Sequence, residues 1–79
     1  MENLAHHITR RLEEVKRSTA LEVTKQIVSD IQVQGKHIFN LRTVEEINIP
    51  TEREPLTRFC QLIWELYEHN DMEHLVVME

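Results

Sequence analysis

Residues 55–69 read PLTRFCQLIWELYEH, and the predicted fold is built outward from this stretch. It contains the only Trp, the only Tyr and the only Cys of the chain. Its apolar side chains recur every three or four residues, which is the spacing of one helix face. At 100° per residue the apolar arc spans roughly 200°, which is wider than a surface helix needs. We therefore predict that this segment is a helix and that it forms the packing centre of the fold.

Signals on both sides of this stretch place its ends. Residues 51–54 form a T-x-x-E capping pattern, and Pro55 follows at a position that the first turn of a helix tolerates. The helix should therefore begin between Thr51 and Pro55 and run to about His69. The β-branched pair Val76–Val77 favours a short closing strand over residues 74–78. A last helical turn is the alternative for that segment.

Residues 3–33 favour a long N-terminal helix, because they contain no Gly or Pro and are rich in helix-forming residues. The apolar stripe of its second half is rotated by roughly a third of a turn from that of its first half. We predict one continuous helix; the alternative is a break at residues 17–19 with Thr19 capping a second helix. A helix that is apolar in two directions needs cover from two sides, and this predicts a homo-oligomer.

The segment between the two predicted helices is shorter and less regular. Gly35, the only Gly, fits a helix C-cap with a left-handed backbone, which we predict. A hairpin turn between residues 31–33 and 37–39 is the alternative. Residues 37–41 are expected to be extended, with a short helical turn after Thr43 and a stop before Pro50.

These expectations define the fold class. We predict a mostly α fold, with a small α+β fold as the alternative: a long N-terminal helix packed on a helix near 53–69, a short extended or β segment between them, and a short C-terminal element. The 79 residues should form one small domain, 1–79. No apolar run is long enough to span a membrane, and no secretory signal pattern opens the chain, so a cytoplasmic location is expected.

The sequence contains no complete catalytic or metal-binding pattern. Glu65 and His69 lie one helical turn apart, but a zinc site needs at least three converging ligands, and no metal-binding sequence frame occurs. Cys60 lies beside the apolar face of its helix, where a thiol behaves as a small hydrophobic group. One Gly cannot build a phosphate-binding loop. We therefore predict a protein that is not an enzyme and has no cofactor, no metal and no catalytic residue.

Charge is distributed unevenly along the chain. Residues 1–39 carry six basic and five acidic side chains, whereas residues 40–79 carry three and nine, and the net charge is −5. Such an acidic half repels phosphate backbones, so nucleic acid is a disfavoured partner. An acidic surface suits a basic protein partner instead. The acidic docking candidates are Glu45, Glu46, Glu52 and Glu54.

The function predicted from these features is that of a small, non-enzymatic homo-oligomer, expected to be a homodimer or a higher homo-oligomer. It would act by protein–protein binding as an adaptor, inhibitor or regulator of a larger partner, since Trp and Tyr are enriched at interfaces. One alternative is a nucleic-acid-associated regulator that uses the N-terminal helix. Another is the binding of a small ligand or metal between subunits. The interface candidates are Leu62, Trp64, Tyr67, Leu21, Ile27, Val28 and Ile31.

Overall fold

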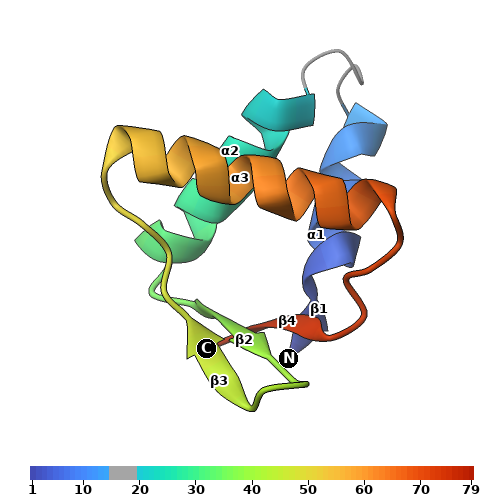
Figure 1. Ribbon diagram of the computed structural model, residues 1–79. Coiled ribbons are helices and arrows are strands. Elements are labelled where there is room, and N and C mark those ends of the chain that lie inside the picture. The colour runs from blue at the N-terminus through green and yellow to red at the C-terminus, as the bar shows by residue number, and fades with distance from the viewer. Residues whose placement is uncertain (15–19) are drawn as a thin grey trace.

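The structure is a computed structural model, and it describes residues 1–14 and 20–79. Figure 1 shows a mixed α+β fold in which helices cover a small antiparallel sheet. This confirms the predicted small α+β alternative and corrects the mostly α class. In chain order the elements are β1 (Glu2–Asn3), α1 (Leu4–Glu14), α2 (Ala20–Val33), β2 (His37–Asn40), β3 (Glu45–Ile47), α3 (Arg53–Glu68) and β4 (Leu75–Met78).

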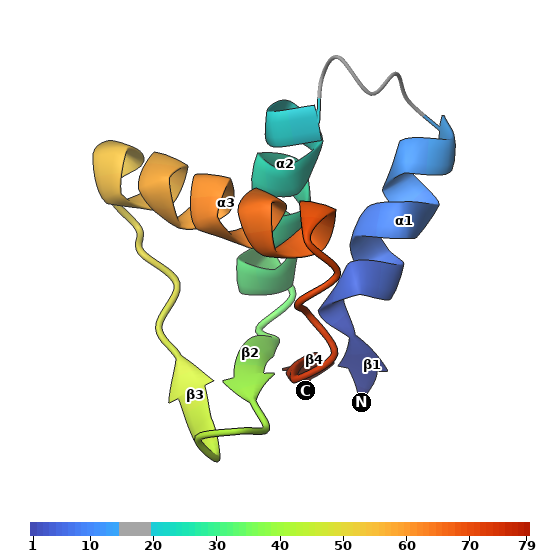
Figure 2. The same cartoon turned by 45° about the vertical axis from the view of Figure 1, so that its right-hand side comes forward.

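The sheet has the strand order β1-β4-β2-β3, and each neighbouring pair is antiparallel. The helices lie on one side of it in both views (Figures 1 and 2). Ile38 pairs with Val77 across β2 and β4, and both residues belong to the hydrophobic core. Because side chains alternate along a strand, Phe39 and its partner Val76 lie on the opposite face.

The core is formed mainly by α1, α2 and the two inner strands, with the loop residue Met72. α1 contributes Leu4 and Ile8, one helical turn apart, and both are fully buried. α3 contributes only Cys60 and Ile63 as buried residues. The prediction that residues 55–69 form the packing centre is therefore wrong. α3 packs on α2 from outside, whereas β4 has neighbours on both edges and buries three consecutive residues.

The predicted continuous N-terminal helix is also wrong. α1 and α2 are separate helices that lie side by side and run in opposite directions (Figures 1 and 2). Residues 15–19, which include the alternative cap at Thr19, lie outside the described residues. The rotation of the apolar stripe has a physical reason: as an antiparallel pair, both helices direct their apolar faces into one core. The chain itself therefore covers both apolar faces, for which a second copy was predicted from the sequence.

Local backbone chemistry explains the turns. Gly35 has φ 71°, its N–H donates to the carbonyl of Gln32 at 3.0 Å, and the N–H of Lys36 donates to that of Ile31 at 2.9 Å. This is a Schellman motif, and it confirms the predicted helix cap. β2 confirms the extended segment, but a hairpin turn follows it in place of the expected helical turn. Asn40 Oδ1 accepts the N–H of Arg42 at 2.9 Å, which stabilises that turn.

Candidate protein-binding site

A groove of about 550 Å³ lies between α1 and the C-terminal end of α3, beside the loop that leads into β4. Other hollows on the described part of the chain have volumes of about 290 to 350 Å³. The groove is lined by Asn3, Ala5, His6, Thr9, Tyr67, Glu68, Asn70, Met72 and Glu73. It is therefore built from segments that are distant in sequence, one at each end of the chain.

Tyr67 is the aromatic residue of the groove, and two contacts fix its orientation. Its hydroxyl lies 2.9 Å from the hydroxyl of Thr9 on α1, within hydrogen-bonding distance. Its ring stacks on Trp64, one turn earlier on α3, with a centroid distance of 5.2 Å and an interplanar angle of 27°. Stacked rings at this spacing attract one another beyond their buried area. The groove thus has a half-buried aromatic wall that is held in place from two sides.

A second Schellman motif ends α3 at the groove. Asn70 adopts φ 53°, its N–H donates to the carbonyl of Tyr67 at 3.2 Å, and the N–H of Asp71 donates to that of Leu66 at 2.9 Å. Asn is one of the few residues other than Gly that tolerate this backbone region. The chain leaves the helix here and turns toward β4.

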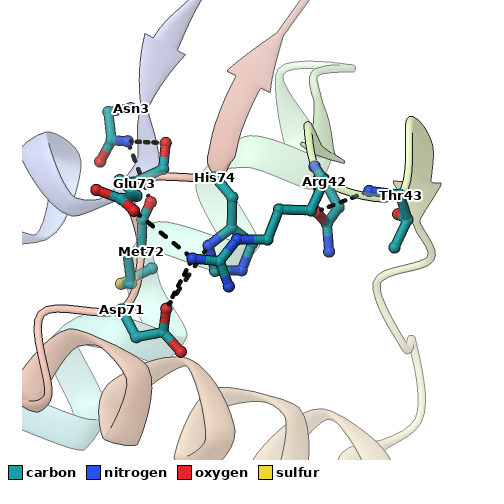
Figure 3. A network of polar contacts seen from close by, with 8 residues as sticks. Asn3, Arg42, Thr43, Asp71, Met72, Glu73 and His74 are labelled. Atoms are coloured by element: carbon teal, nitrogen blue, oxygen red, sulfur yellow. Dashed lines mark hydrogen bonds and ion pairs between the residues drawn. The ribbon is translucent and has the colours of Figure 1, made fainter.

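Asn3 fastens the loop after α3 to the start of the chain, as Figure 3 shows. Its Nδ2 donates to the carbonyl oxygens of Met72 at 3.1 Å and Glu73 at 3.2 Å. Its Oδ1 accepts the N–H of Ala5 at 2.9 Å and so caps α1. One side chain therefore fixes both the beginning of α1 and the wall of the groove that carries Glu73.

Ion pairs reach the same loop from the β2–β3 turn (Figure 3). Arg42 Nη2 lies 3.4 Å from Asp71 Oδ1 and 3.6 Å from Glu73 Oε1. His74 Nδ1 lies 3.9 Å from the same oxygen of Asp71. The Arg42 and Glu73 side chains are more than half exposed, so each pair contributes little to stability by itself. The loop is nevertheless contacted from two sides.

The lining of the groove includes two carboxylates. Glu68 and Glu73 line it together with His6, and no Lys or Arg among the described residues does. Within residues 1–14 and 20–79, Glu68 forms no ion pair. The arrangement of an aromatic ring, two hydroxyls and two carboxylates suits a cationic side chain, which can contact the ring face and the carboxylates together.

The structure separates the predicted interface residues into three groups. Ile27, Val28 and Ile31 are almost wholly buried within this chain, which leaves them no surface for another. Leu21, Trp64 and Tyr67 are half-buried, and the last of these reaches the groove. Leu62 is 60% exposed on α3 and is the one candidate that presents a large apolar surface.

The predicted acidic docking residues lie away from the groove. Glu45 and Glu46 belong to β3, at the sheet edge, and Glu46 is 3.2 Å from His37. Glu52 and Glu54 are exposed at the start of α3, at the other end from Tyr67. Sequence reasoning did not connect Asn3 and Thr9 with the site. No local pattern signals them, because their contacts span 58 to 70 positions.

Neither a metal-binding cluster nor an activated cysteine is present among the described residues. In the part of the chain that the structure describes, no group of three or more His, Cys, Asp or Glu side chains could hold a metal ion. Cys60 is fully buried, and burial raises the pKa of its thiol, which opposes formation of the nucleophilic thiolate. This fits the predicted role of Cys60 as a core residue.

Two basic residues of α1, Arg10 and Arg11, form ion pairs within the chain, which bears on the alternative of a nucleic-acid-associated regulator. Arg10 Nη2 lies 2.6 Å from Glu2 Oε1, and Arg11 Nη1 lies 3.1 Å from Asp30 Oδ2. Both guanidinium groups therefore already have a carboxylate partner, which leaves less positive charge for phosphate.

None of the helices that the structure describes has the length and apolar character that a membrane crossing requires. Comparison with protein-family models, with curated proteins and with solved structures finds no match for this chain. The inferences that follow rest on its own residues.

Proposed function

We propose that this chain is a small, non-enzymatic regulator, acting in the cytoplasm as an adaptor or inhibitor of a larger protein. It binds by receiving a basic side chain of that partner in the groove between α1 and the end of α3. One observation carries the proposal: a groove of about 550 Å³ combines Tyr67, Glu68 and Glu73, and none of the described Lys and Arg residues lines it.

The recognition chemistry follows from these three side chains. An arginine of the partner stacks its planar guanidinium on the Tyr67 ring and donates hydrogen bonds to Glu68 or Glu73. A cation over an exposed aromatic ring contributes about 0.5–1 kcal/mol, and each exposed ion pair contributes about 0.2–1 kcal/mol. One side chain in the groove therefore gives weak binding, and a tight complex requires further contacts around the rim.

Long-range charge supports the same partner. The chain carries a net charge of −5, and its acidic residues concentrate in the C-terminal half, which includes Glu68 and Glu73. A field of one sign raises the rate at which oppositely charged partners arrive, and salt weakens it. The regulator would thus attract basic segments before the groove selects among them.

The test uses an acetylated and amidated hexa-arginine peptide, with hexa-serine as the neutral control. Because Trp64 is the only Trp and stacks on Tyr67, its fluorescence reports binding in the groove. At low salt, hexa-arginine should change this fluorescence in a saturable manner, and hexa-serine should not. The double substitution Glu68→Gln/Glu73→Gln should weaken binding by about 2- to 30-fold, the equivalent of two exposed ion pairs.

A matched control separates the groove from general acidity. Glu45→Gln/Glu46→Gln removes the same charge from the edge strand β3. If both double variants weaken binding equally, the peptide senses net charge and the groove has no specific role. Absence of any fluorescence change with wild-type protein would also reject the proposal.

A further inference from the structure

The solvent-facing side of α3 has a pattern that the fold itself does not use. Counted at 100° per residue, Glu54, Arg58, Glu65 and His69 fall within roughly 60° of one another. All four are exposed, and Leu62, 60% exposed, lies beside them near the middle of the helix. Figure 1 shows α3 crossing the front of the molecule, so this face points away from α2. We call these five residues the α3 outer face.

The charges on the α3 outer face are arranged symmetrically. Arg58 and Glu65 lie at equal distances, about 5 Å along the axis, on either side of the midpoint between residues 61 and 62. Glu54 and His69 are equally spaced about the same midpoint. Consider a second copy related to the first by a two-fold axis that passes through this midpoint at right angles to α3. Arg58 of each copy then lies opposite Glu65 of the other, which gives two such pairs. A parallel arrangement would instead place like charges together, which is unfavourable.

A hollow on α3 lies where the two-fold rotation would place Arg58 of the second copy. About 350 Å³ of space lies beside the C-terminal half of α3, lined by Leu62, Glu65, Leu66, His69 and Asp71. Under the two-fold rotation, this segment faces Arg58 of the second copy. An arginine can pack its aliphatic stem on leucine side chains while its guanidinium binds carboxylates. The hollow offers both, because it contains two leucines and two acidic residues.

The central charges have no other role in the described structure. Among the side chains of residues 1–13 and 20–79, neither Arg58 nor Glu65 forms an ion pair. Leu62 likewise remains largely in water, where burial against another copy would be favourable.

We propose that two copies of this chain associate through the α3 outer face as an antiparallel, two-fold symmetric helix pair. A shallow crossing angle of about 20° keeps all the charge pairs within reach. α3 has 16 residues and is therefore about 24 Å long, so the contact is smaller than the roughly 800 Å² per partner of a standard interface. The dimer is consequently weak and depends on protein concentration and salt.

Sedimentation equilibrium over a concentration series tests the arrangement. Wild-type protein should show a monomer–dimer equilibrium that weakens as salt increases. Arg58→Glu and Glu65→Arg should each weaken the dimer by about 5- to 30-fold, since each creates two like-charge contacts. The double variant Arg58→Glu/Glu65→Arg should restore association, because it reverses every central pair. Arg53→Glu, an equal charge change on another side of α3, should leave association within about twofold of wild type.

All the substituted residues are exposed, so circular dichroism should show folded protein in each case. Wild-type protein that stays monomeric up to about 1 mM would overturn the proposal. A double variant that fails to regain association would overturn the antiparallel register. The dimer does not depend on the groove. Leu62→Ser removes exposed apolar surface from the α3 outer face and should weaken the dimer. Repeating the hexa-arginine titration with this variant tests the groove alone, so the two proposals can fail separately.

Discussion

Replacing Asn3 with Ala should destabilise the fold far more than a change at the third residue of a chain usually does. The side chain caps α1 through Oδ1 and ties the loop before β4 through Nδ2, with three hydrogen bonds of 2.9, 3.1 and 3.2 Å. Loss of an N-cap costs about 1 kcal/mol, and each remaining bond contributes about 0.5–1.5 kcal/mol, with the exposed bond to Glu73 at the lower end. The expected loss is about 2–3 kcal/mol.

That loss is a large part of the total free energy of unfolding. A chain of this length unfolds with about 4–12 kcal/mol, and each kcal/mol shifts the Tm of a 60–100-residue fold by about 4–8 °C. Asn3→Ala should therefore lower the Tm by about 8–24 °C. The free energy of unfolding is measured by urea titration, with Trp64 fluorescence and helical circular dichroism as independent probes. Agreement of the two probes checks that unfolding is two-state.

Asn3→Ser separates the two roles of the side chain. Serine keeps an oxygen that can cap α1 but lacks the amide donor that reaches the carbonyls of Met72 and Glu73. The free energy of unfolding of Asn3→Ser should therefore be about 1 kcal/mol higher than that of Asn3→Ala. If Asn3→Ala changes the free energy of unfolding by less than about 0.5 kcal/mol, the bridge does not stabilise the protein and the reasoning fails.

Two further predictions concern single residues. Gly35→Ala should lower the free energy of unfolding, measured by urea titration, by about 1–2 kcal/mol. The cost comes from the left-handed backbone alone, because nothing lies within 4 Å of the added Cβ. Gly35→Asn should cost less. Burial lowers the pKa of His7 below its ordinary 6.5. Glu2 raises this pKa, with 3.3 Å between His7 Nε2 and Glu2 Oε2, but the nearby Arg10, Lys36 and His6 lower it further. Below about pH 6.5 the unfolded chain therefore binds a proton that the folded chain resists, so stability should fall as pH drops through this value. His7→Gln should flatten that dependence; a slope equal to that of the wild-type protein would contradict the assignment.

The features predicted correctly from sequence are those set by neighbouring residues. The start of α3 near Pro55, its end beside Asn70 and the cap at Gly35 depend on backbone chemistry within a few positions. β4 was readable for the same reason, since Val76 and Val77 favour a strand locally.

The sheet could not be derived in this way. β1 has two residues, and β3 reads EEI, so neither shows the alternation that reveals a strand. Their strand identity comes from pairing with β4 and β2. The division of residues 3–33 into two helices was given only as the alternative, because no Gly or Pro lies between them. The rotation of the apolar stripe was visible, but it was assigned to two neighbours and not to one shared core.

The groove was only half predictable. Tyr67 stood out as the single Tyr on an apolar helix, and Leu62, one of the predicted interface candidates, is 60% exposed. The opposite wall is supplied by Asn3 and Thr9, whose part in the site depends on how α1 docks. Side chains that meet across most of the chain acquire a common role only after folding.

The pairing of β1 with β4 joins residues 2–3 to residues 76–77. During synthesis, Leu4 and Ile8 leave the ribosome long before Leu75 and Val77, their companions in the core. At about 5–20 residues per second the interval is roughly 4–14 s. Throughout that time the apolar faces of α1 and α2 lack the central strand that completes their cover. The nascent chain would therefore be a natural client for a chaperone, and the final folding step would come only after residues 75–78 have left the ribosome.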